Sequence, residues 1–183
     1  HNNGDAARAL YTAVGMGYEV EAEALRDTTA WLQEPEAWDD NALGLEFADK
    51  KLARIQFAGA LGDAMVAGAI SDPTPLADAA ALIAADQADD GSFPLDTSGS
   101  IGSPATYGTA LATGAALRAL RQAGTTDLAP VIARADAWVR GIEVKSVNDA
   151  AGVVLALGSA GDPAAIAQRQ RCLELITKGR APS

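Results

Sequence analysis

The sequence predicts an all-α protein built from paired helices, and three observations lead to that prediction. Alanine is abundant, whereas β-branched residues are sparse and aromatic residues make up only 5% of the chain. This balance favours helices, because alanine loses no side-chain entropy in a helix. Amphipathic segments recur along the chain, and each follows a segment of small apolar residues. We therefore expect each pair to have an inner, small-residue helix and an outer, amphipathic one.

The clearest outer helix is predicted over residues 128–142. Its apolar positions recur at helical spacing on one face, and Arg134 and Arg140 fall on the other. Pro130 suits the first turn, where its missing N–H costs nothing. The apolar positions are Leu128, Val131, Ile132, Ala135, Trp138, Val139 and Ile142.

Two further helices are predicted after it. Residues 149–160 are apolar on every side after the first residue, which indicates a helix buried all round. Gly152 and Gly158 would let neighbouring helices approach closely. Asp162 is a good N-cap for a helix over residues 163–178. The expected apolar face of this last helix consists of Ile166, Leu173 and Ile176.

The same alternation appears earlier in the chain and predicts about four pairs, each of roughly 35 to 55 residues, as expected of helical repeats. One such pair cannot bury its apolar faces alone, so the pairs must pack on one another. The outcome is either an open solenoid with a concave groove or a closed ring with the small-residue helices inside. The upstream segments are 109–121, which precedes the helix at 128, 58–70, which precedes a helix opening at Pro75, and 5–18, which precedes 22–33.

One motif narrows the choice. Residues 87–93 read Gln-Ala-Asp-Asp-Gly-Ser-Phe, and Tyr107-Gly-Thr-Ala-Leu follows fourteen residues later. This pattern resembles the repeat of squalene–hopene cyclases and protein prenyltransferase β subunits, Gln-x-x-Asp-Gly-Ser-Trp followed by a helix opening with Thr-Ala-Leu. The resemblance implies an α/α toroid. The residues that carry it, which we expect to be structural, are Gln87, Asp90, Gly91, Ser92, Phe93 and Tyr107, with phenylalanine in place of the usual tryptophan.

Each motif residue has an expected structural role that follows from its chemistry. Asp90 and Gly91 form a tight turn, since glycine adopts positive φ without strain. We expect the Gln87 amide to bond the backbone at the start of the next helix, and Phe93 to pack over the turn and tie adjacent repeats together.

Weaker copies of the motif extend the resemblance over most of residues 20–180. Trp31, Gln33 and Trp38 keep the aromatic residues and the glutamine without the Asp-Gly, and Trp138 lies in a third, glutamine-free copy. We interpret residues 1–183 as a single toroid-like domain. Residues 179–183 resemble the lead-in to another turn, so we expect either that the chain is part of a longer protein or that the ring is incomplete.

Charge and composition exclude several partners. The formal net charge of −10 and the pI near 4.4 argue against nucleic acid and anionic membrane surfaces. No uninterrupted apolar run of about 18 residues is present, so no membrane span is expected. The only cysteine, Cys172, is predicted to be a buried core thiol. The only histidine, His1, is either a tag remnant or the first residue after a cleaved signal, which would make the protein secreted or periplasmic; the compartment and oligomeric state are otherwise undetermined.

The catalytic sets of the enzymes whose repeat this motif resembles are missing. The cyclases protonate an alkene with Asp-x-Asp-Asp, which does not occur here, and the prenyltransferases hold zinc with an aspartate, a cysteine and a histidine, which His1 and Cys172 cannot supply. We therefore expect no metal and no cofactor, and the catalytic residues are unknown. Asp39-Asp40 and Asp89-Asp90 are interpreted as turn residues. The remaining candidate carboxylates, interpreted as surface charges on helices, are Glu46, Asp49, Asp63, Asp78 and Asp86.

Three hypotheses for the function follow. The first is a non-catalytic toroid or solenoid that binds an apolar small molecule or a protein partner. The second is a fragment of a terpene cyclase or prenyltransferase-type enzyme whose catalytic residues lie outside this chain. The third is a carbohydrate-active α/α barrel, which would use paired carboxylates on different loops.

Overall fold

The computed structural model describes residues 2–40, 49–95 and 108–179, and eight α-helices occupy most of them. Two short 3₁₀ helices, η1 (Pro35–Asp40) and η3 (Thr126–Leu128), accompany them, and these ranges contain no strand. The all-α prediction is thus confirmed. The α-helices are α1 (Asn2–Gly15), α2 (Ala22–Leu32), α3 (Lys50–Val66), α4 (Thr74–Ala85), α5 (Gly108–Ala123), α6 (Ala129–Gly141), α7 (Val147–Leu157) and α8 (Pro163–Lys178).

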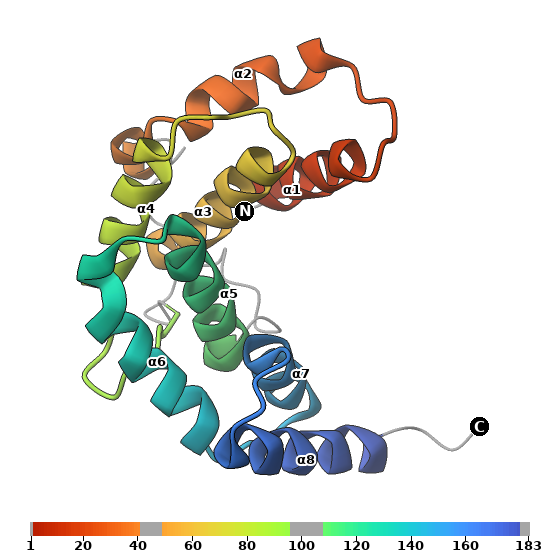
Figure 1. Ribbon diagram of the computed structural model, residues 1–183, viewed down its shortest axis with the longest axis vertical. Helices are drawn as coiled ribbons and strands as arrows, with labels where there is room; N and C mark the ends of the chain where they lie inside the picture. Colours follow the sequence, from red (N-terminus) through yellow and green to blue (C-terminus); the bar gives the residue numbers. More distant parts are fainter. Residues whose placement is uncertain (1, 41–48, 96–107, 180–183) are drawn as a thin grey trace.

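The helices form an arc of inner and outer partners (Figure 1). Helices α1, α3, α5 and α7 follow the inner side and pack on one another in that order, while α2, α4, α6 and α8 lie outside them. Gly152 of α7 approaches Ala110 and Leu111 of α5, and Gly114, one turn further along α5, approaches Ala156, one turn further along α7. These two inner helices therefore run parallel, as successive repeats require. Closure of the arc into a toroid stays a prediction.

The inner helix predicted over residues 58–70 begins eight residues earlier, at Lys50. The carboxylate of Asp49 caps it by accepting the backbone N–H of Leu52 at 2.9 Å. The first turn begins with two lysines, so it does not continue the pattern of small apolar residues that predicted the helix. Only single positions such as Leu52 and Ile55 are buried there. The start of α3 is therefore set by the Asp49 cap, which lies outside the segment of small residues that predicted the helix.

Helix α7 is not buried all round, contrary to the prediction. Ala150 and Val153 are fully buried and Gly152 packs on α5, but Leu155 exposes 73% of its surface. The reason is its place in the arc: α7 is an inner helix with α5 and α8 on two sides, and its remaining side faces the hollow of the arc. An apolar sequence on every face does not guarantee a neighbour on every face.

The predicted apolar face of α8 is confirmed at Ile176, which packs on the core, but is wrong at Ile166 and Leu173. The buried residues are Ala165, Gln168 and Cys172, whereas Ile166 and Leu173 are about half exposed. Gln168 can be buried because its amide donates to the Ile142 carbonyl at 2.8 Å, the C-cap of α6. The Cys172 thiol is buried as predicted, and burial raises its pKa.

Candidate functional site

The turn at residues 87–93 has the geometry that its sequence predicts. Gly91 has a φ of +92°, and Asp90 Oδ1 accepts the Ser92 backbone N–H at 2.9 Å and the Ser92 hydroxyl at 2.7 Å. These bonds to the charged form lower the pKa of the Asp90 carboxyl. Phe93 is buried, and its backbone N–H donates to Thr113 Oγ1 of α5 at 3.0 Å. The turn therefore fastens the end of α4 to α5.

The same turn also fastens α4 to α6. The Gln87 amide nitrogen donates to the Gly91 carbonyl at 3.1 Å and to the Val131 carbonyl at 2.9 Å, while Arg134 donates to the Gln87 amide oxygen. The contact expected at the next helix is thus made to the first turn of α6, the next outer helix. Trp138 completes the junction by donating from Nε1 to Asp90 Oδ2 at 3.2 Å. Trp138 is therefore a partner of the Gln87 turn, and its place in a further copy of the motif stays a prediction.

The weaker motif near the start of the chain forms an aromatic cluster instead of a staple. Trp31 and Trp38 have ring centroids 6.1 Å apart and share Phe57 of α3 at 4.7 and 5.5 Å. Gln33 is exposed and donates to the Thr29 carbonyl at 3.2 Å, within its own chain segment. Gln33 therefore does not make the contact between helices that Gln87 makes. Tyr107 lies outside the described residues.

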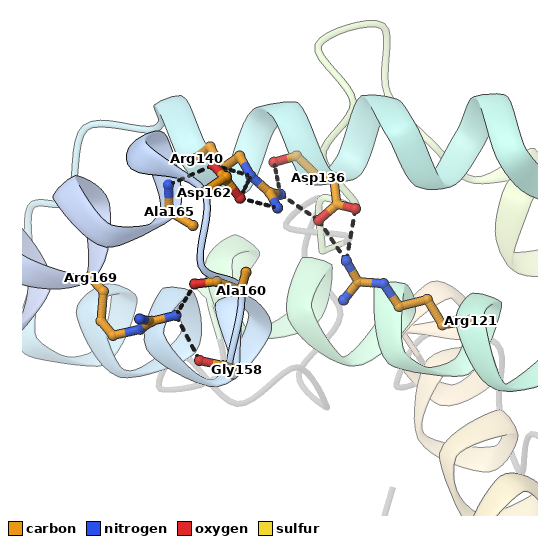
Figure 2. Close-up of polar contacts among 8 residues, drawn as sticks. All are labelled: Arg121, Asp136, Arg140, Gly158, Ala160, Asp162, Ala165 and Arg169. Atoms are coloured by element: carbon orange, nitrogen blue, oxygen red, sulfur yellow. Dashed lines mark hydrogen bonds and ion pairs between the residues drawn. The ribbon is translucent and has the colours of Figure 1, made fainter.

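Ion pairs join α6 to α8, where no glutamine motif is present (Figure 2). Arg140 reaches Asp162, the N-cap of α8, at 3.0 Å and Asp136 at 2.7 Å, and Arg121 of α5 reaches the same Asp136 at 2.6 Å. The Arg140 guanidinium, with the Ala165 N–H second, lowers the pKa of the Asp162 carboxyl. A chain of alternating charges thus connects α5, α6 and α8.

The candidate carboxylates have structural partners. Asp86, at the C-cap of α4, accepts from Arg54 at 2.8 Å, and Arg54 also binds Asp39. Asp49 is the buried cap described above, so its interpretation as a surface charge is wrong. The same interpretation is wrong for Asp63 and Asp86, because both are held in ion pairs and are largely covered. Asp78 is exposed, and Glu46 lies outside the described residues.

Asp63 lies at the centre of the inner side. Its side chain is only 9% exposed, and it binds Arg8 Nε of α1 at 3.2 Å and Arg118 Nη2 of α5. One carboxylate of α3 therefore ties three successive inner helices together. The low exposure makes it a stronger link than the ion pairs on the outer surface, where water competes for the charges.

Two adjoining cavities lie against this cluster, and we call them together the concave groove. One, of about 420 Å³, lies between α1, α5 and α7, and the other, of about 560 Å³, extends from it past the C-terminal ends of α5 and α7. They share Gly114, Arg118 and Leu155. The first is also lined by Asp5, Arg8, Leu111, Ala115 and Gly152, and the second by Arg121, Gln122 and residues 156–160.

The inner helices carry a charge opposite to that of the whole chain. Helices α1, α3, α5 and α7 contain six basic and three acidic residues, whereas the chain has a net charge of −10. Arg118 and Arg121 are the charged residues of α5. The charged residues that line the groove itself are Arg8, Arg118 and Arg121, with Asp5, among apolar and small residues.

The sequence interpretation missed Arg8, Arg118 and Leu155. A signal for Arg118 was present: Asp63 and Arg118 each interrupt a stretch of small apolar residues in an inner helix. Isolated charges of opposite sign in neighbouring buried helices indicate a pair, because an unpaired buried charge is costly. Leu155 had no such signal, since nothing in the sequence shows which side of α7 is uncovered.

The described residues offer no metal site, and the pKa values that burial raises among them are those of the Tyr11 hydroxyl and the Cys172 thiol. No group of three or more histidine, cysteine, aspartate or glutamate side chains converges within residues 2–40, 49–95 and 108–179. The aspartates whose pKa departs from the ordinary value are Asp72, Asp90 and Asp162, and all three move down. In the same ranges, no helix has the length and hydropathy needed to cross a bilayer. Comparison with protein-family models, curated protein sequences and solved structures gives no match.

Proposed function

We propose that this chain is a non-catalytic binding module whose concave groove takes a small amphiphile, a molecule with an apolar body and an acidic group. The observation that carries the proposal is the groove itself, with the exposed Leu155 on one wall and the Arg118 guanidinium on another. Its two parts, about 420 and 560 Å³, fall within the range of small-molecule pockets, about 300–1,000 Å³.

The apolar body would lie between α5 and α7. Leu111, Ala115 and Leu155 line this part, together with Gly114 and Gly152, whose lack of a side chain lets α5 and α7 pack closely. Leu155 is 73% exposed. Covering such a side chain yields roughly 1.5–3 kcal/mol when burial is complete, so a ligand gains affinity there without any rearrangement of the helices.

The acidic group would lie at Arg118. This side chain is half exposed and lines both cavities, and its contact with Asp63 uses only Nη2 within the described part of the chain. The remaining N–H groups of the guanidinium are then available to a carboxylate in the planar, forked arrangement that arginine favours. Asp63 holds Arg118 from below and limits the entropy lost when a ligand binds.

Two further observations support this reading. The polar contacts of Asp49, Asp63 and Asp86 are those of structural carboxylates, which favours binding over acid–base catalysis. The Gln87 turn bonds successive repeats as the cyclase–prenyltransferase pattern implies, and we propose kinship with that repeat family on this basis.

The test is isothermal titration calorimetry with decanoate and, as the uncharged control, decanol. Replacing Arg118 with alanine should weaken decanoate binding by about 10- to 100-fold, since a hydrogen bond to a charged group contributes about 1.5–3 kcal/mol. The same variant should leave decanol binding within about twofold. Arg26→Ala is the matched control, because Arg26 also pairs with acids but lies on α2 away from the groove.

The proposal fails if decanoate and decanol do not bind to the folded wild-type protein. It also fails if Arg118→Ala and Arg26→Ala bind decanoate equally well. Loss of both ligands in Arg118→Ala with unchanged circular dichroism would place the apolar contacts, rather than the guanidinium, at the centre of recognition and contradict the acidic-group assignment.

A further inference from the structure

The two parts of the concave groove follow one another along α5. Leu111 lines the first part only, Arg118 lines both parts, and Gln122 lines the second part only. Arg118 comes seven residues after Leu111, which is about 10 Å of helix, and Gln122 comes four residues after Arg118, which is about 6 Å. The guanidinium proposed to bind the acidic group therefore belongs to the junction of the two parts, and the groove continues beyond it.

The part beyond Arg118 has a polar lining. It is formed by Arg121 and Gln122 at the end of α5 and by Ser159 after the end of α7, and no acidic residue of the described ranges lines it. The Gln122 amide oxygen is buried beside Gly62 of α3 and has no hydrogen-bond partner in the part of the chain that the structure describes. Because a terminal amide turns about a broad torsion, a ligand hydroxyl at this end can supply the donor that the oxygen lacks.

The charges on and behind the groove sum to one positive charge. The charged residues that line it, with the ion-pair partners that they contact, form two chains of two acids and two bases each. Arg169 adds a further positive charge, and it donates to the Gly158 and Ala160 carbonyls at 2.8 Å each (Figure 2). Asp149, the charged residue of α7, lies nine residues before Gly158, about 14 Å along the helix, where salt screens it from this end. The first chain consists of Asp5, Arg8, Asp63 and Arg118, and the second of Arg121, Asp136, Arg140 and Asp162.

One negative charge is therefore balanced at this end of the groove, whereas a second would have no counterpart. The charged group must also bear a substituent on each side, an apolar one toward Leu111 and a polar one toward Gln122. A phosphodiester meets both conditions, and its two free oxygens suit an arginine. Resting on the binding function proposed above, we infer that the groove takes a single-chain phosphodiester amphiphile, with the phosphate at Arg118 and an uncharged, hydroxyl-bearing group at Gln122.

Isothermal titration calorimetry of the full chain tests this inference with two probes that share one acyl chain. Decanoyl lysophosphatidylglycerol has the phosphodiester and a glycerol beyond it, whereas decanoyl lysophosphatidic acid ends in a phosphomonoester with a second charge. Lysophosphatidylglycerol should bind about tenfold more tightly, because it alone reaches Gln122 and brings only one charge. Decanoate is titrated alongside them to test the proposed function itself.

Gln122→Met removes the acceptor and keeps the length of the side chain. It should lower the ratio of the two lysophospholipid affinities by about fivefold, while circular dichroism confirms that the variant is folded. Gln170→Met is the matched control, because Gln170 is exposed on α8, bonds Glu174 and does not line the groove, and it should keep the wild-type ratio.

Lysophosphatidic acid that binds as tightly as lysophosphatidylglycerol would overturn the inference. So would a ratio that Gln122→Met leaves unchanged, because the glycerol would then not lie at the end of α5. If decanoate still binds in either case, the proposed function stands and only the ligand class is wrong. If none of the three probes binds, the proposed function fails and this inference fails with it.

Discussion

Replacing Gly91 with alanine tests the junction of α4, α5 and α6 at a single atom. Gly91 has a φ of +92°, and a Cβ at this position would lie 2.6 Å from the Arg134 carbonyl oxygen and 2.8 Å from its carbon. Both atoms belong to the backbone of α6, so no side-chain rotation relieves the contact. Either α6 moves away from the turn or the turn opens.

The cost has two parts that a control separates. An L-residue in the left-handed region costs about 1–2 kcal/mol, and an added methyl that displaces packed backbone costs about 1–3 kcal/mol more. Gly124 has a φ of +67°, but a Cβ there meets nothing closer than 4.0 Å. Gly124→Ala should therefore lose about 1 kcal/mol, and Gly91→Ala about 3 kcal/mol.

Urea unfolding followed by far-ultraviolet circular dichroism measures both free energies of unfolding. We expect the two free energies of unfolding to differ by about 2 kcal/mol, because both variants carry the cost of the positive φ but only Gly91→Ala carries the cost of the clash with α6. Equal losses would mean that the turn does not touch α6 and would refute the junction. The indole N–H resonance of Trp138 in NMR reports the same junction independently, because this N–H donates to Asp90 in the turn.

Three further predictions follow from the other contacts. Gly152→Ala should lower the free energy of unfolding by about 2–4 kcal/mol, because its Cβ would lie 2.7 Å from the Leu111 backbone nitrogen. The control Gly141→Ala should not destabilise the protein, because a Cβ there meets nothing within 4 Å. Urea unfolding compares the two variants, and equal stabilities would contradict the close approach of α5 and α7. Asp63→Asn should lower the free energy of unfolding by about 2 kcal/mol, which is less than the loss of a fully buried pair would cost, because its arginine partners are partly hydrated. Thermal unfolding that matches the wild type would contradict the role of Asp63 in joining α1, α3 and α5. The Asp90 carboxyl, whose pKa is lowered in the folded protein, stabilises the fold above its unfolded pKa of about 3.9, and this contribution is lost as pH falls through the folded pKa. Carboxyl-carbon NMR should place its titration below that of an unstructured aspartate, and a midpoint at or above about 3.9 would contradict the turn.

The sequence predicts helix type and pairing well because both depend on local pattern. The outer helix at 128–142 is confirmed nearly residue for residue as α6, with Ala135 and Val139 fully buried. The turn at Gly91 is confirmed because few residues other than glycine tolerate its φ. Local rules of this kind need no knowledge of the neighbours.

The errors concern which side of a helix is covered. Leu155 and Leu173 are apolar and exposed, while the polar Gln168 is fully buried. Hydrophobicity predicts burial on average, but here the arc leaves one side of α7 and of α8 without a neighbour, and a hydrogen bond to Ile142 makes the burial of Gln168 inexpensive. These facts depend on the arrangement of helices, which a single sequence does not specify.

The candidate site was hidden for a related reason. The motif residues, Gln87 and Phe93 among them, build the junctions between repeats, and the groove lies on the opposite, inner side at Arg118. Two isolated charges, Asp63 and Arg118, were visible in the sequence, but their pairing becomes apparent only when α3 lies beside α5. A motif that stabilises a scaffold therefore does not locate the site that the scaffold forms.

We propose that ligands bind in the concave groove between α1, α5 and α7. A titration of the ¹⁵N-labelled protein with decanoate, followed by amide chemical shifts, tests it most directly. We expect saturable shifts concentrated at Leu111, Gly114 and Gly152, with the outer helices α2, α4 and α6 unchanged. Shifts that map to the outer helices, or that rise linearly without saturation across the whole chain, would contradict it.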